Sequence, residues 1–348
     1  MPPSAEIPVI DIAAEGVSEK EIAKALVDAA AEQGFIYIKS TGQALPSKKL
    51  FKETPLEEKK RCTIQTNNRG WSGMYSETLD PKNQKSGDTK EAFNFGEFKD
   101  GKAQQPLPST LASLEPEVAK FFEHCSSLCQ RILYLLGLGL EVSPADFFSS
   151  AHTQENGASG TILRLLYYPA PSDAPVDDTS IRAGAHSDYG SITLLFRLKG
   201  QAGLEILTPS ETWAPVPVVP PGTENDPSPP ILVNIGDLLS YWTNGLFRST
   251  VHRVTVPTMT ASMSGTVSSP SEMVAGEAAG ERYSIAFFCH PIGDTRLEPV
   301  PSRRVQKFVD PKVGEGFNPY AQRKVLTADE HLMMRLRASY KGLYEEKV

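Results

Sequence analysis

The sequence predicts an α+β fold in which helices flank a β-rich core, and three observations support it. Residues 1–150 hold most of the long helical patterns, whereas short β-rich runs follow one another from Thr161 onward. Turn residues separate these runs, which is typical of a sandwich or barrel rather than of alternating βα units. A last helical pattern spans Thr327 to Tyr340. We therefore expect a mixed helical region over 1–150 and a β domain with a C-terminal helix over 151–348.

Capping and periodicity define the first elements. Residues 8–12 and 35–38 are apolar and β-prone, so they predict two short strands. Ser18, with Glu21 three positions later, forms a capping-box pattern that predicts the start of a helix. Gly34 is expected to end that helix, because glycine is common directly after a helix.

Three longer segments complete the first half of the chain. Residues 46–61 predict another helical segment, and residues 67–98, rich in glycine and aromatic side chains, predict a loop with short ordered pieces. The longest helical pattern covers Glu115–Leu140. Its apolar stripe is interpreted as core packing.

The second half is predicted to be mainly strands. Two stretches interrupt the pattern: residues 215–230 are rich in proline, and residues 257–280 are rich in Ser, Thr, Ala and Gly. We interpret 257–280 as a surface insertion, and the alternative is a lid that covers an active site. Thr327 and Glu330 form a second capping-box pattern at the start of the last helix. The predicted strands are 161–168, 190–197, 203–207, 231–235, 237–242, 250–256 and 282–289.

Composition narrows the class of protein. The chain has 348 residues, of which 40% are hydrophobic, so it can bury a sizeable core. It has no apolar run as long as a membrane span and no pattern of a secretory signal. A net charge of −7 argues against a nucleic-acid surface, because neutralising phosphates requires clustered lysine and arginine. We expect neither a membrane nor a nucleic-acid partner, and a monomer and a homodimer both remain open.

The four cysteines bear on the compartment. They include no Cys-x-x-Cys pair, although Cys125 and Cys129 stand four residues apart on a predicted helix. That spacing could hold a metal only with further ligands nearby. We expect free thiols in a reducing compartment, and therefore a cytoplasmic protein.

The segment His186-Ser187-Asp188, with His252 later in the chain, is the strongest chemical signal in the sequence. Two imidazoles and one carboxylate can occupy one face of an Fe(II) ion and leave the other face open. On a strand, residues two apart point to the same side, so His186 and Asp188 would enter a barrel interior together. A lone His-x-Asp pair is weak, because chance supplies many of them.

A second spaced pair, Arg282 and Ser284, strengthens the assignment. The two residues lead a β-rich run and share one face of the predicted strand. A guanidinium with a hydroxyl beside it suits a carboxylate ligand.

This ordered set of motifs resembles the 2-oxoglutarate/Fe(II)-dependent dioxygenases, and within them the branch of isopenicillin N synthase and fungal small-molecule oxygenases. The resemblance spans nearly the whole chain. It also rests on Ile7–Asp11, Gly34–Ile38, Lys90–Gly96, Tyr167-Tyr168-Pro169 and Asn234–Asp237. It implies a double-stranded β-helix, a jelly-roll barrel with iron inside one mouth.

The resemblance also implies ligands and cosubstrates. His186, Asp188 and His252 would bind Fe(II), with 2-oxoglutarate and O2 as cosubstrates. The far carboxylate of 2-oxoglutarate would contact Arg282, Ser284 and Tyr168. The sequence departs from the family at one position, because Leu166 stands where asparagine is usual. Any polar contact from position 166 is therefore in doubt.

Position along the strands suggests substrate contacts. Arg164 shares a strand face with Tyr168, Tyr189 follows the proposed metal carboxylate, and Phe288 shares a face with Arg282. For Arg164 the alternative is a surface ion-pair partner. Aromatic walls with one cation would suit a flat aromatic, heterocyclic or acidic small molecule. This set also resembles the fungal pyrimidine hydroxylases. Segment 93–95 is a further candidate for the pocket mouth, with core packing as an equal alternative for its two Phe.

We therefore expect an enzyme that oxidises a C–H bond of a small metabolite, with release of succinate and CO2. Hydroxylation is the main expected outcome, and desaturation, ring closure or ring expansion are the alternatives. One alternative is an oxidase of the isopenicillin N synthase or ethylene-forming kind, which uses the same iron site. Another is a cupin-like protein that binds a ligand without catalysis. Both would share the barrel, so only the chemistry separates them.

Overall fold

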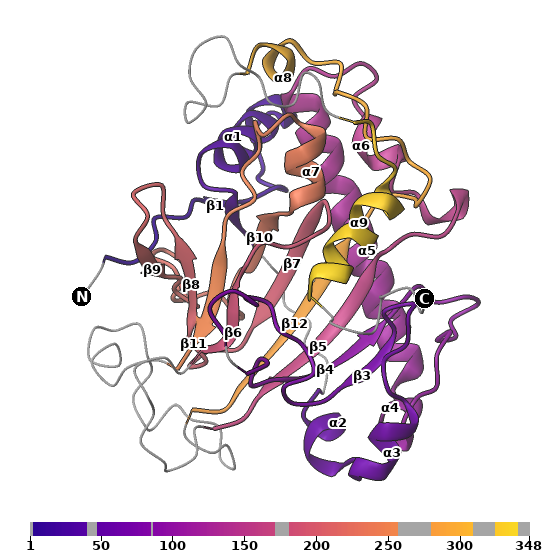
Figure 1. The fold of residues 1–348 in the computed structure, drawn as a ribbon. Helices are drawn as coiled ribbons and strands as arrows, with labels where there is room; N and C mark the ends of the chain where they lie inside the picture. The colour runs from indigo at the N-terminus through magenta and orange to yellow at the C-terminus, as the bar shows by residue number, and fades with distance from the viewer. Residues whose placement is uncertain are drawn as a thin grey trace.

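The computed structural model describes residues 3–39, 47–84, 86–170, 181–256, 280–308 and 324–339. Two β-sheets face each other and form a jelly-roll barrel, with helices on the outer side of the larger sheet (Figure 1). This confirms the α+β class and the double-stranded β-helix core.

The larger sheet has eight strands, and strands from both halves of the chain contribute to it. Their order across the sheet is β1, β2, β10, β7, β12, β5, β4 and β3. All neighbours are antiparallel except β1 and β2. The bounds are β1 Val9–Ile10, β2 Phe35–Ile38, β3 Gly70–Ser72, β4 Glu91–Phe95, β5 Ile162–Tyr168, β7 Ile192–Arg197, β10 Ile231–Ile235 and β12 Arg282–Cys289.

The smaller sheet has four strands in the order β6, β11, β8 and β9. Buried apolar side chains from both sheets, including Leu166, Leu232 and Val254, pack together in the interior. The bounds are β6 Ile181–His186, β8 Leu204–Leu207, β9 Trp213–Pro215 and β11 His252–Thr255.

A second, larger core lies between the eight-stranded sheet and helices α1 and α5. Ser18 caps α1 as predicted: its hydroxyl accepts from the Glu21 amide, and the Glu21 carboxylate accepts from the Ser18 amide. The predicted long helix is α5, and its apolar stripe is buried in this core. The helices are α1 Glu19–Glu32, α2 Ser47–Glu53, α3 Leu56–Arg61, α4 Ser109–Ala112, α5 Glu115–Gly139, α6 Phe147–Ser150, η1 Gln154–Asn156, α7 Asp237–Trp242, α8 Arg303–Lys307 and α9 Ala328–Ser339.

Two predicted elements are wrong in detail. Residues 237–242 form helix α7 and not a strand, because the apolar residues Leu238, Leu239 and Trp242 have helical spacing in a run too short to show a period. The predicted helix over 46–61 is two helices, α2 and α3, separated around Pro55.

Strands β6 and β9 were missed, and β3 and β4 lie in the segment 67–98 that was expected to be mostly loop. β6 is hard to detect because its sequence, IRAGAH, combines small and charged residues. β6 also ends at His186, so Asp188 lies in the loop after the strand. The shared strand face proposed for His186 and Asp188 is therefore wrong, although both side chains reach the same site.

Some predictions are left untested. The insertion at 257–280 falls almost entirely on 257–279, outside the described residues, and the division of the chain near residue 150 also stays a prediction. Among the helices of the described residues, none combines the length and the apolar character that a membrane span needs. All four cysteines are free and buried, which agrees with the predicted free thiols.

Candidate iron and cosubstrate site

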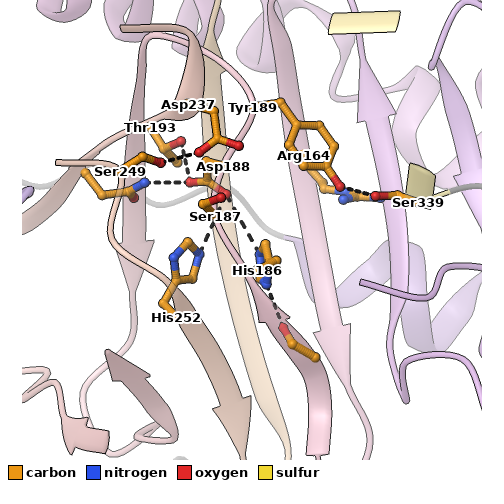
Figure 2. A network of polar contacts seen from close by, with 12 residues as sticks. Arg164, His186, Ser187, Asp188, Tyr189, Thr193, Asp237, Ser249, His252 and Ser339 are labelled. Atoms are coloured by element: carbon orange, nitrogen blue, oxygen red, sulfur yellow. Dashed lines mark hydrogen bonds and ion pairs between the residues drawn. The ribbon is translucent and has the colours of Figure 1, made fainter. Parts of the chain in front are cut away.

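Three side chains of metal-ligand type meet inside the barrel, as Figure 2 shows. His186 at the end of β6 and His252 at the start of β11 are partners across the smaller sheet. Oδ1 of Asp188 lies 3.8 Å from Nε2 of His186 and 3.6 Å from Nε2 of His252. Both separations are below the about 4.2 Å that two metal–ligand bonds of about 2.1 Å can span. All three ligand atoms lie within 4.8 Å of one another, so they could share one ion.

Each histidine is oriented through its other ring nitrogen. Nδ1 of His186 lies 2.7 Å from the carbonyl oxygen of Gly184, and Nδ1 of His252 lies 3.1 Å from that of Thr250. A carbonyl only accepts hydrogen bonds, so each Nδ1 must carry the proton. The lone pair of each Nε2 then faces Asp188, which is the arrangement a metal ligand requires.

The carboxylate of Asp188 is held by two neighbouring strands. Its Oδ2 accepts hydrogen bonds from Thr193 of β7 at 2.6 Å and from Asn234 of β10 at 2.7 Å. Oδ1 is thereby left facing the histidines. Sequence reasoning assigned no such role to Thr193 or Asn234, because only the sheet order places them beside Asp188.

The shifted pKa values of His186 and Asp188 favour the protonation states that bind a cation. Burial, followed by the neighbouring His252, lowers the pKa of His186 to about 4, so the ring is neutral near pH 7. Burial alone would raise the pKa of Asp188. The two histidines and the hydrogen bonds from Thr193 and Asn234 outweigh burial, and the pKa of Asp188 is lowered. A neutral imidazole and an ionised carboxylate are the forms that bind metal.

Arg282 lies at the first position of β12, opposite Tyr168 of β5. Its guanidinium is 4.8 Å from the Tyr168 ring centroid and donates to the Ser284 hydroxyl at 3.2 Å. Nε of Arg282 is buried without a hydrogen-bond partner, and no carboxylate in the described part of the chain pairs with this guanidinium. A buried, uncompensated cation is costly, so this end of the pocket fits an anionic ligand.

One pocket contains both the candidate iron ligands and Arg282. The inward faces of β5 and β12 line it, because alternate residues on paired strands point to the same side. Leu166 is among these residues, so an apolar side chain occupies the position where the resemblance predicts asparagine. The lining residues from these two strands are Ile162, Arg164, Leu166, Tyr168, Arg282, Ser284, Ala286 and Phe288.

Comparison with known proteins places the chain in a family. Residues 159–291 match the model of the 2OG-Fe(II) oxygenase superfamily. Residues 7–113 match the N-terminal region of the non-haem dioxygenases in morphine synthesis. A UPF0676 protein of Schizosaccharomyces pombe is 33% identical over 88% of each chain. The chain belongs to the 2OG-Fe(II) oxygenase superfamily.

Two further relatives agree with this assignment to the isopenicillin N synthase-like branch. A 2-oxoglutarate-dependent dioxygenase of Aspergillus niger is 27% identical, over 82% of this chain and 84% of the relative. A full-length Neurospora crassa protein, solved in complex with alpha-KG and thymine, is 28% identical with a TM-score of 0.70, over 95% of this chain and 96% of that chain. The protein is therefore a non-haem dioxygenase of small molecules that uses Fe(II), 2-oxoglutarate and O2.

The three candidate substrate residues of the oxygenase all line the pocket. Phe288 is partly exposed there and offers an apolar wall. Tyr189 also offers a wall, but its hydroxyl is hydrogen-bonded to Ser339 of α9. Arg164 is buried, and both of its terminal nitrogens lie 3.2–3.3 Å from the carboxylate of Glu77. The charge of Arg164 is thus already compensated by the protein.

Glu77 belongs to a buried ion-pair network that the sequence did not reveal. Lys90 lies 2.7 Å from Glu77, and it also pairs with Asp88. All four charged residues are less than a tenth exposed, and Glu77, Lys90 and Arg164 line the pocket. Residues 67–98 were expected to be mostly loop, so only the folded chain shows that this segment supplies a charged wall of the oxygenase pocket.

His290 is a further pocket residue that sequence reasoning missed. It follows β12 and lines the pocket, and its Nδ1 is buried without a hydrogen-bond partner. Burial lowers the pKa of His290 to about 3, so the ring is neutral and offers one donor and one acceptor. Of segment 93–95, Asn94 lines the pocket, whereas Phe93 and Phe95 pack in the larger core.

Proposed function

We propose that the oxygenase hydroxylates a C–H bond of a small, flat, neutral heterocycle that carries hydrogen-bonding groups. In this proposal His186, Asp188 and His252 bind Fe(II), and Arg282, Ser284 and Tyr168 hold the far carboxylate of 2-oxoglutarate. The observation that carries it is the single pocket, in which a metal-ligand set, an uncompensated arginine and a charge-balanced wall meet.

Each part of the pocket has a chemical task. Bound iron, with 2-oxoglutarate and O2, supplies the oxidising chemistry, in which the substrate gains a hydroxyl and 2-oxoglutarate becomes succinate and CO2. Arg282, at the start of β12, fixes the cosubstrate at one end of the pocket, and Phe288 lies near the opposite end of the same strand. Leu166, Ala286 and Phe288 give the site an apolar lining, which limits water around the reacting atoms.

The charge of the pocket wall distinguishes neutral from acidic substrates, a choice that the sequence left open. Two cations, Lys90 and Arg164, face two carboxylates, Glu77 and Asp88, so the network has no net charge. An acidic substrate would have to compete with Glu77 for Arg164. A neutral molecule can instead donate to Glu77 and accept from Arg164 without breaking the pair. The balance therefore favours a neutral polar ring over an acid.

A structural relative indicates which ring to test first. The Neurospora crassa protein was solved with thymine and, separately, with 5-formyluracil, and its match covers 95% of this chain. Pyrimidine bases are flat, neutral and carry N–H and C=O groups, as the charge argument requires. They are the first candidates, followed by purines and other amide-containing rings.

The test measures succinate released by the purified enzyme with Fe(II), 2-oxoglutarate and each compound of a panel. The panel contains pyrimidines, purines and their carboxylated analogues, for example uracil beside orotate. We expect neutral rings to stimulate succinate release and to yield an equal amount of hydroxylated product. Stimulation by the carboxylated analogues alone would contradict the neutral-substrate proposal.

The alternative functions are not favoured, because the relatives named above include 2-oxoglutarate-dependent dioxygenases and because Arg282 offers a place for the cosubstrate. We further propose that the enzyme acts in the cytoplasm, on the basis of its four free cysteines. A lack of nucleic-acid and membrane partners is likewise proposed, from the net charge and composition alone.

A further inference from the structure

Helix α9 contacts the loop that carries Asp188 on both sides of that residue. The guanidinium of Arg335 lies 3.4 Å from the hydroxyl of Ser187 and 5.0 Å from the ring centroid of Tyr189. Ser339, one turn further along the helix, hydrogen-bonds the Tyr189 hydroxyl (Figure 2). Ser187 and Tyr189, which flank the proposed iron ligand Asp188, are thus both held by one helix that begins 140 residues later in the chain.

Arg335 also pairs with the first residue of α7, whose backbone is hydrogen-bonded to the same loop. It pairs with Asp237 at 2.8 Å, and the other carboxylate oxygen of Asp237 accepts from Ser249 at 2.6 Å. The backbone amide of Asp237 donates to the carbonyl oxygen of Asp188 at 2.7 Å. Asp237 therefore connects Arg335, the Asp188 backbone and the segment that leads into His252.

We propose that Arg335 is a positioning residue of the iron site, which holds the Asp188 loop in the geometry that Fe(II) binding requires. The inference rests on the proposed iron ligands and adds a role for α9 to them. Leu332 and Leu336 of the same helix line the pocket. Docking of α9 therefore also builds a wall of the substrate pocket, so the helix is part of the active site.

The exposure of the pair argues for positioning over stability. The side chains of Arg335 and Asp237 are 35% and 19% exposed. Ion pairs that reach solvent contribute little to the free energy of unfolding. Removing a group that orients metal ligands, in contrast, typically weakens metal affinity by about 10- to 100-fold. Arg335 should therefore influence metal binding much more than thermal stability.

The test is a calorimetric titration of the full-length protein with Mn(II). Mn(II) replaces Fe(II) because it is not oxidised during the measurement. We expect Arg335→Ala to raise the Kd for Mn(II) by about 10-fold or more and to lower the melting temperature by a few degrees at most. Arg335→Lys, which keeps a cation near Asp237, should give an intermediate Kd. A Kd within twofold of wild type for Arg335→Ala would overturn the proposal.

Two controls separate the possible causes. Arg337→Ala removes an exposed arginine of the same helix and should leave the Kd unchanged; a loss equal to that of Arg335→Ala would show that α9 is merely destabilised and would also overturn the proposal. Asp188→Ala should abolish Mn(II) binding. If it does not, the ligand assignment fails, whereas loss in Asp188→Ala without loss in Arg335→Ala refutes only the positioning role. Should Arg335→Ala fail to fold, Arg335→Gln decides by the same criteria.

Discussion

At the scale of single residues, the proposed iron site depends on which ligand atoms the neighbouring groups leave without a hydrogen bond. Hydrogen bonds from Thr193 and Asn234 occupy one oxygen of Asp188, and backbone carbonyls occupy Nδ1 of both histidines. The remaining oxygen and the two Nε2 atoms all face one point. The ligand set is therefore oriented by the protein before any metal binds.

Arg282→Leu tests the cosubstrate anchor. A hydrogen bond to a charged group contributes about 1.5–3 kcal/mol, so we expect the Kd of 2-oxoglutarate to rise about 10- to 150-fold. The measurement is a 2-oxoglutarate titration of the Mn(II)-loaded protein. Arg296→Leu, at an arginine whose side chain is 66% exposed, is the control and should change nothing. An unchanged cosubstrate Kd in Arg282→Leu would refute the anchor role.

Lys90→Met tests the buried network. The substitution leaves Asp88 and Glu77 with less compensating charge, and breaking a buried pair typically costs about 3–5 kcal/mol. We expect a loss of that size in the free energy of unfolding, measured in urea. The matched control is Lys102→Met, which removes a pair whose lysine is 71% exposed and should cost no more than about 1 kcal/mol. Equal effects of the two variants would show that the network is not buried in solution.

At the scale of elements, the sequence predicted what local patterns encode. The capping box of α1, the long stripe of α5 and the strands β10 and β12 agree with expectation because caps and long apolar runs are local signals. Helix α7 was misread, because its single short run is too brief to separate the helical period from that of a strand. β6 was missed because its residues have no clear alternation.

Helix α9 offers a test at this scale. Thr327 and Glu330 form the predicted capping box, with hydrogen bonds of 2.9 and 3.2 Å between backbone and side chain. Thr327→Ala should lower the free energy of unfolding by about 0.5–2 kcal/mol, because a helix N-terminus loses its cap. Thr327→Ser keeps the hydroxyl and should stay close to wild type in the same urea titration. If both variants unfold like wild type, the cap does not stabilise α9.

At the scale of the whole molecule, the site exists only through the topology. The sequence predicted that the iron ligands, Arg282 and Phe288 would come together, because their motifs have a known order, and the pocket contains them all. It could not predict the contributions of Glu77, Lys90, His290 and α9. No local pattern assigned these residues a role in the site, and only the closing of the barrel brings them to the pocket.

The most direct test of the central claim is the turnover of 2-oxoglutarate by wild type and by His186→Ala, Asp188→Ala and His252→Ala. Each ligand is one of only three that the protein supplies to an open iron site. We predict succinate release that requires Fe(II) and is stimulated by a neutral heterocycle in the wild type. All three variants should lose it while keeping the circular dichroism spectrum of the folded chain. Turnover close to wild type in any one of the three would contradict the account.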